Sequence, residues 1–330
     1  MQEKSYDYQW EELYDNQEAK KKISNWKSDY GPLVLERDSE QKAKKTRFQI
    51  LIDNQSLEIY LVGSFNNWEK DTEKLEEFRL EHDDFSLFAS IETEKVSHKD
   101  PYKFLIKEGS KTYYLPDPAA SYFDHEGNSI FWDFEDPNSY KLKYPFIDTF
   151  HRSTRIAQTD LPGLISHYAH QKTGKLGKEI PQSEYFTFIA ESGVIQELKD
   201  LGFNTIQFLP FAQSIDGTNW KYRYLVPFQF AIQKNWGNPD EFAKMIDAFH
   251  EAGIAVIGDF VLGHLPHKDY RVFGQDCNEA GIHLWKARDR SMLYLKEETS
   301  WGTMRINFDN HYVREFFISS TIHFLKNYRI

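Results

Sequence analysis

The sequence contains a single cysteine, Cys277, in 330 residues. One cysteine excludes a disulfide within the chain and a C-x-x-C pair that could hold zinc. No apolar run approaches the roughly 18 residues that a membrane-spanning helix needs. The first residues, Met-Gln-Glu-Lys-Ser-Tyr-Asp, contain no hydrophobic segment of the kind that directs export. We therefore expect a cytoplasmic protein that does not enter a membrane.

The chain also has an excess of negative charge, because 51 Asp and Glu outnumber 40 Lys and Arg. The formal net charge is -11 at pH 7. Nucleic-acid binding depends on clustered Lys and Arg that neutralise phosphates, so the charge argues against a nucleic-acid partner. It is compatible with a neutral polymer. Aromatic residues make up 16% of the chain. Composition alone cannot tell core rings from rings that stack on sugars.

Motifs of several enzyme classes are missing. The sequence has no G-x-x-x-x-G-K-[ST] phosphate loop and no H-E-x-x-H metal motif. His264 and His267 are three residues apart, but Pro266 between them breaks any helix that would present both to one ion. We expect neither a metal site nor a cofactor.

The first half of the chain shows three patterns. Residues 1–45 are charged and include a helical pattern, which predicts a partly helical extension. Residues 46–138 contain short apolar runs separated by turn clusters, as in an antiparallel β-sandwich. Its strands are expected at residues 48–52, 57–62, 85–91, 102–106, 113–115 and 129–134. Residues 139–162 are irregular and indicate a linker.

Residues 163–330 alternate predicted strands and helices, which indicates a parallel sheet with right-handed crossovers. Strands are expected at residues 164–168, 203–209 and 253–264. A first helix is expected through residues 188–198, ended by Gly202.

The next two helices carry clearer signals. One has Asn238 as N-cap, Pro239 in first position, Glu241 in a capping box and Gly253 past its end. The last helix, at residues 312–328, is expected to be capped by Asp309 or Asn310. Its predicted core residues are Val313, Phe316, Phe317, Phe324 and Leu325.

The stretch from Gly253 to His264 is the most informative one. Its first residues are apolar or Gly without alternation, which predicts a central strand covered on both faces. Asp259 and His264 follow where this strand ends. In α/β barrels that edge is where sites are built. A capping carboxylate and a loop histidine would give the same short pattern.

The context of this strand resembles a known family. Asp259-Phe260-Val261-Leu262-Gly263-His264, residues 237–242 and the Trp301-Gly302-Thr303 segment with Asn307 together resemble the first half of the catalytic barrel of glycoside hydrolase family 13. Within that family the 1,4-α-glucan branching enzymes are most similar. The resemblance covers roughly residues 160–330 and implies about three β/α units of a (β/α)8 TIM barrel.

The segments Val62-Gly63-Ser64-Phe65-Asn66-Asn67-Trp68, Tyr102-Lys103-Phe104 and Leu115-Pro116-Asp117-Pro118 resemble the family 48 carbohydrate-binding module. The resemblance implies an immunoglobulin-like sandwich in which Trp68 and Lys103 bind α-glucan. The alternative is a structural spacer in which Trp68 only packs. The expected partner is a glycogen-like or starch-like α-glucan.

The family resemblance also implies roles for other residues. A retaining enzyme needs a carboxylate nucleophile and an acid about 5 Å apart. In the family these two groups lie beyond the position of residue 330. The resemblance therefore implies no catalytic residue here, and the chain alone is expected to be inactive. Asp259, His264, Tyr222 and Asn307 would form the wall of the glucose site. Asp259 would pair with an arginine of the following strand, His264 would donate to a glucose 6-hydroxyl, and Tyr222 would stack on that glucose.

Two departures from the family pattern leave alternatives open. Gly263 stands where α-amylases have a calcium-binding Asn, so no calcium is expected there. The loop after Trp220 also differs from that of branching enzymes. Debranching enzymes and maltooligosyl-trehalose hydrolases share the two-domain layout, and a non-catalytic glucan-binding protein is a further possibility.

Overall fold

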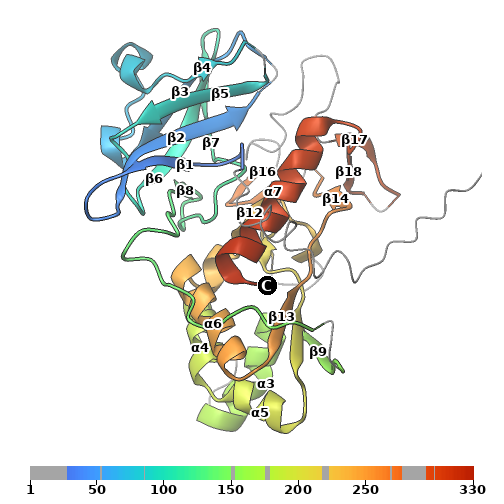
Figure 1. Cartoon of the computed structure of the whole chain (residues 1–330). Helices are drawn as coiled ribbons and strands as arrows, with labels where there is room; N and C mark the ends of the chain where they lie inside the picture. The colour runs from blue at the N-terminus through green and yellow to red at the C-terminus, as the bar shows by residue number, and fades with distance from the viewer. Residues whose placement is uncertain are drawn as a thin grey trace, which may run out of the picture.

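A computed structural model describes residues 28–52, 54–84, 86–149, 153–174, 179–217, 223–267, 270–276, 295–300 and 302–330. Figure 1 shows a β-rich part formed by the N-terminal third and a mixed part with most of the helices below it. The long helix α7 (His311–Tyr328) runs beside both. Within the described ranges no helix is long and apolar enough to cross a membrane.

Two antiparallel sheets form the β-rich part. The first has the strand order β1 (Leu33–Arg37), β2 (Ala43–Leu51), β5 (Phe88–Thr93), β4 (Glu81–His82). The second contains β3 (Glu58–Gly63), β6 (Pro101–Glu108) and β7 (Lys111–Leu115), and β8 (Ser129–Ile130) also pairs with β6. Alternate side chains of both sheets meet in one core that includes Phe48, Leu61 and Phe104.

The strands differ from expectation at their ends. β1 lies inside the range predicted as a charged extension and pairs with β2. The strand expected at residues 85–91 begins at Phe88, and the one expected at 129–134 ends at Ile130. Phe131 still pairs with the chain before β6, since its N–H donates to the Asp100 carbonyl at 3.0 Å, whereas the Asp133 N–H binds a side chain, His98 Nδ1, at 3.0 Å. The predicted domain boundaries remain predictions.

The mixed part contains a parallel sheet of three strands, in the order β13 (Ala255–Gly258), β10 (Thr205–Phe208), β9 (Ile156–Thr159). Parallel pairing of consecutive strands confirms the sheet type that the alternation predicted. In the described part of the chain β10 is the middle strand and β13 an outer one. The prediction that residues 253–264 form a central strand is therefore wrong.

The strand predicted at residues 164–168 is also wrong, since these residues lie in helix α3 (Leu161–Thr173). Leu161, Leu164, Ile165 and Tyr168 are buried at helical spacing. Asp160 caps this helix by accepting from the Gly163 N–H. The first parallel strand is β9, just upstream.

The next predicted helix is two helices, α4 (Tyr185–Glu191) and α5 (Val194–Asp200). Gly193 separates them at φ 82°, a left-handed conformation that ends α4.

The other helix signals are confirmed. Helix α6 (Pro239–Glu251) begins with the Asn238 and Glu241 capping box. Asn310 caps α7 by accepting from the Tyr312 N–H at 2.9 Å. Leu325 was expected in the core, but it is 37% exposed, because Phe324 beside it takes the inward position.

Short antiparallel pairs complete the fold. They are β11 (Ala212–Gln213) with β12 (Phe228–Ile232), β15 (Arg271–Val272) with β16 (Gln275–Asp276), and β14 (His264–Leu265) with β18 (Met304–Ile306) and β17 (Leu295–Glu298). Figure 1 shows β14 and β18 beyond the C-terminal end of β13. A hydrophobic cluster that joins Tyr30 and Leu51 to Phe316 of α7 ties the two parts together.

Candidate active-site wall

Two carboxylates stand at the C-terminal edge of the parallel sheet. Asp160 directly follows β9, and Asp259 directly follows β13. Arg223 Nη2 lies 3.0 Å from Asp160 Oδ2, and the Tyr224 hydroxyl donates to Asp259 Oδ2 at 2.9 Å. Two neighbouring residues of one segment thus bind the carboxylates of both outer strands.

His264 meets the same segment. Its Nε2 lies 2.9 Å from the backbone oxygen of Tyr224. A carbonyl oxygen only accepts, so the ring nitrogen is the donor. Asp259 and His264 therefore converge on Tyr224. Because the Nε2 proton is already used, a hydrogen bond from His264 to a sugar hydroxyl would have to come from Nδ1 of the protonated ring or follow loss of the Tyr224 contact.

The electrostatics of this segment hold its groups in defined protonation states. Burial, the hydrogen bond to Asp259 and the charge of Asp259 raise the pKa of Tyr224 to about 12. Tyr224 therefore remains a donor at neutral pH. Burial lowers the pKa of Arg223, and the charge of Asp160 opposes that shift. The Arg223 guanidinium also lies 4.7 Å from the ring centre of Trp236, which restricts its orientation.

Of the two remaining predicted wall residues, the structure describes only Asn307. Asn307 is half-buried and directly follows β18, in which Arg305 pairs with His264. Tyr222 lies outside the described residues. The sequence interpretation missed Asp160 and Tyr224. The apolar run at residues 164–168 predicts a first strand downstream of the observed β9, which leaves Asp160 in the predicted linker.

The predicted glucan-binding residues lie on one face of the β3-β6-β7 sheet. Lys103 pairs with Val62, whose side chain belongs to the cluster on the face opposite the shared core. Trp68 packs against that same cluster. Burial lowers the pKa of Lys103, and the charges of Asp124 and Glu126 oppose the shift.

The turn that carries Trp68 is unusual. Asn67 and Trp68 both adopt left-handed conformations, at φ 53° and 54°. Asn66 stabilises the turn, since it accepts from the Gly63 N–H and donates to the Leu61 carbonyl, each at 3.0 Å. Left-handed backbone at a bulky residue is costly and clusters at functional sites. The geometry holds an aromatic ring and an amine on one surface.

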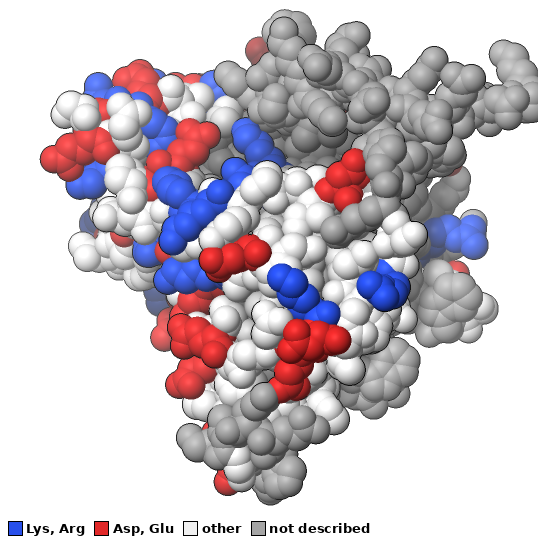
Figure 2. Space-filling model, turned by 60° about the horizontal axis from the view of Figure 1, so that its bottom comes forward, with Lys and Arg blue, Asp and Glu red and all other residues white. Residues whose placement is uncertain are grey.

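Charge does not single out a polyanion surface on the face seen in Figure 2. Lys and Arg are interspersed with Asp and Glu there. Among the residues that the structure describes, no group of three or more His, Cys, Asp or Glu is arranged to hold a metal ion.

Sequence comparisons relate part of the chain to known proteins. Residues 192–301 match the alpha-amylase family, described as "Alpha amylase, catalytic domain". The 1,4-alpha-glucan branching enzyme GlgB of Corynebacterium efficiens is 33% identical over 138 residues, which is 42% of this chain and 18% of that enzyme. The enzyme of the same name from Oceanobacillus iheyensis is 28% identical over 286 residues, 86% of this chain and 41% of that one. The chain spans less than half the length of these relatives.

Solved structures extend the similarity to the β-rich part. Pullulanase from Anoxybacillus sp. LM18-11 in complex with maltotriose aligns with a TM-score of 0.66 at 16% identity, over 93% of this chain and 44% of that one. A putative alpha amylase from Salmonella typhimurium gives 0.62 at 18% identity, over 92% and 43%. At these identities the likeness concerns the fold. The chain is thus similar to the alpha-amylase family in sequence over residues 192–301 and in fold over most of its length.

Proposed function

We propose that the chain is part of an enzyme that acts on α-glucans, most like a 1,4-α-glucan branching enzyme. The observation that carries this proposal is the convergence of Asp259 and His264 on Tyr224 at the C-terminal edge of the parallel sheet. That edge is where α/β barrels build active sites. All three residues fall inside the stretch that matches the alpha-amylase catalytic domain.

In this proposal the chain supplies one wall of the glucose site, formed by Asp259, His264, Tyr222 and Asn307. Retaining transfer also needs a nucleophilic carboxylate and a carboxylic acid on opposite sides of the scissile bond. By the resemblance, those groups belong to barrel strands after Ile330. The 6-hydroxyl of a second glucan would then accept the glucosyl group in place of water.

Glucosyl transfer by the chain joined to the remaining barrel strands of a branching enzyme tests this function. Branching shifts the iodine spectrum of amylose without releasing reducing ends. We expect the joined protein to branch, Asp259→Asn to lose most of that activity, and residues 1–330 alone to leave the spectrum unchanged. Release of reducing ends would instead favour debranching or hydrolysis of the pullulanase or trehalose-hydrolase kind. Full activity of Asp259→Asn would contradict the role given to Asp259.

A second candidate function is glucan binding by the sandwich. Trp68 and Lys103 lie on one sheet face, and the turn of Trp68 is held in a conformation that costs energy. Native electrophoresis of the chain in gels that contain glycogen should show retardation. We expect Trp68→Ala and Lys103→Met to abolish it, and Phe308→Ala, which removes an exposed ring outside the β-rich part, to preserve it. Unchanged retardation of Trp68→Ala would refute this role.

A further inference from the structure

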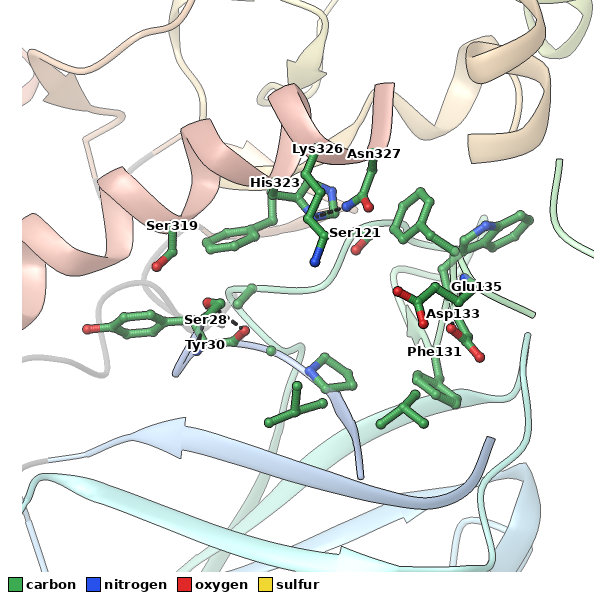
Figure 3. A pocket seen from close by; sticks show the side chains of 18 of the residues that line it. Ser28, Tyr30, Ser121, Phe131, Asp133, Glu135, Ser319, His323, Lys326 and Asn327 are labelled. Atoms are coloured by element: carbon green, nitrogen blue, oxygen red, sulfur yellow. Dashed lines mark hydrogen bonds between the residues drawn. The ribbon is translucent and has the colours of Figure 1, made fainter. Parts of the chain in front are cut away.

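The β-rich part contacts the rest of the chain with uneven packing. Between it and α7 lies a cavity of about 360 Å³, whose lining includes Trp132 and His323. Figure 3 shows His323 and Lys326 of α7 across this cavity from Tyr30. Packing is incomplete there. At a different contact the β-rich part contributes Phe123, whose side chain is 0% exposed.

Phe123 lies in the turn before β8, where its backbone bridges to Ser129. Its ring packs against two rings of the mixed part. The ring centres are 4.5 Å from Phe228, in β12, and 4.8 Å from Phe273, between β15 and β16. Phe228 and Phe273 stack on each other with an interplanar angle of 14°. The turn fits closely, because a Cβ on Gly127 would lie 2.7 Å from Phe273.

A buried lysine just after β12 holds the same turn. Lys234 is 8% exposed, and its Nζ donates to the backbone oxygens of Asp124 at 3.0 Å and His125 at 2.8 Å. Burial lowers the pKa of Lys234, and the charges of Asp124 and Asp216 oppose that shift. A buried ammonium needs such acceptors. Lys234 therefore fixes where the turn lies relative to β12.

The contact reaches the segment that forms the candidate site. Leu225 and Phe228 belong to the same buried cluster as Phe123, together with Ile215. The Leu225 backbone oxygen accepts from the Ile215 N–H at 2.9 Å. A ring of the β-rich part therefore completes the packing around Leu225.

Leu225 is joined directly to Tyr224, which connects the two wall residues. The Tyr224 hydroxyl donates to Asp259, and its backbone oxygen accepts from His264, each at 2.9 Å. That oxygen belongs to the planar peptide unit that Tyr224 shares with Leu225. A shift of the Leu225 backbone therefore moves the acceptor of His264 with it.

We propose that Phe123 is a positioning residue of the active-site wall. Its ring, held in place by Lys234, fixes the segment of Leu225 and Tyr224 so that Asp259 and His264 keep their contacts. The use of this wall in glucosyl transfer rests on the proposed function, whereas the positioning is a property of the chain without glucan. The β-rich part thus helps to form the site, independently of any glucan bound at Trp68.

Nuclear magnetic resonance of the full chain without glucan tests this role. The ring signal of His264 is assigned by its loss in His264→Gln, and hydrogen exchange of the Ile215 amide is followed in the same samples. Phe123→Leu removes the ring and keeps an apolar side chain. We expect it to shift the His264 signal and to speed the Ile215 exchange about tenfold.

Phe48→Leu is the matched control, because Phe48 is also 0% exposed but lies in the core between the two antiparallel sheets, outside the cluster of Phe123. It should leave the His264 signal and the Ile215 exchange as in the unmodified chain. Lys234→Met removes the donors to the turn and should act as Phe123→Leu does. Lys99→Met breaks the ion pair with Asp240, at another contact between the two parts, and should change neither measurement.

The outcomes separate this inference from the proposed function. A His264 signal and an Ile215 exchange rate that stay unchanged in Phe123→Leu, or that change equally in Phe48→Leu, overturn the positioning role. Circular dichroism verifies the fold of each variant, and Lys234→Met decides the question should Phe123→Leu not fold. If His264 responds as expected but the joined protein does not branch amylose, the positioning stands and the proposed function fails.

Discussion

Arg223 and Tyr224 are neighbours in the chain, but their side chains bind carboxylates that follow different strands. Arg223 pairs with Asp160 after β9 at 3.0 Å, and Tyr224 binds Asp259 after β13 at 2.9 Å. The strand register puts both carboxylates at the same level, because Phe208 of β10 pairs with Thr159 and with Gly258. One short segment therefore spans the edge at which a glucan is proposed to bind.

Replacing Tyr224 with Phe should cost stability. The change removes the donor to Asp259 and keeps the ring, and a hydrogen bond to a charged group at a half-buried position contributes about 1–2 kcal/mol. Urea unfolding at pH 7 measures this. In a double-mutant cycle with Asp259→Ala, the coupling energy should account for most of the loss. Tyr114→Phe on the sandwich face is the control, and an equal effect of both substitutions would contradict the pairing.

Acid should destabilise the chain partly through His323. Its folded-state pKa of about 3 lies below the ordinary value of about 6.5, so between these values the unfolded chain binds more protons. The contribution is complete above pH 6.5 and is lost as the pH falls toward 3. Between pH 7 and pH 5 it amounts to about 2 kcal/mol.

His323→Phe should lower the loss of stability between these two pH values by that amount, as measured by denaturant unfolding. The exposed His311→Phe on the same helix is the control. Identical pH dependence of the unmodified chain and His323→Phe would show that the imidazole is not buried in its neutral form.

Asn238→Ala should weaken the start of α6. Its side chain accepts from the backbone N–H groups of Asp240 and Glu241, and the Glu241 carboxylate accepts from the Asn238 N–H at 2.7 Å. Loss of such a cap costs about 1 kcal/mol. Thermal unfolding should show a lower midpoint for Asn238→Ala than for Asn235→Ala, an exposed asparagine three residues earlier. Equal midpoints would argue against the cap.

Gly63→Ala should disrupt the turn before Trp68. An added Cβ would lie 2.3 Å from the Pro101 carbonyl oxygen and 2.5 Å from a Phe65 ring carbon. Backbone must move to relieve the first contact, and we expect a loss of more than about 2 kcal/mol. Gly263→Ala adds the same methyl where nothing lies within 4 Å, so it should be nearly neutral. Glycogen retardation of Gly63→Ala should fall together with its stability.

Local signals in the sequence were sufficient to predict several helices and strands. Asn238, Pro239 and Glu241 predicted the start of α6, because a capping box involves only residues within one helical turn. The short apolar runs between turn clusters likewise predicted most strands of the β-rich part, although not β1 or β4. At residues 164–168 a short apolar run predicts a strand, but these residues lie in helix α3, whose buried face includes Leu164, Ile165 and Tyr168. A short apolar run does not distinguish a strand from a buried helical segment.

The sequence by itself determined the strand-helix alternation, the capped helices and the candidate pair Asp259 and His264, since these depend on neighbouring residues. Only the tertiary structure decided that both meet at Tyr224 and that Trp132 and His323 line one cavity. Tyr224 and Asp259 are 35 positions apart in the sequence, and Trp132 and His323 are 191 positions apart. Such contacts depend on how whole elements pack, which no local pattern encodes.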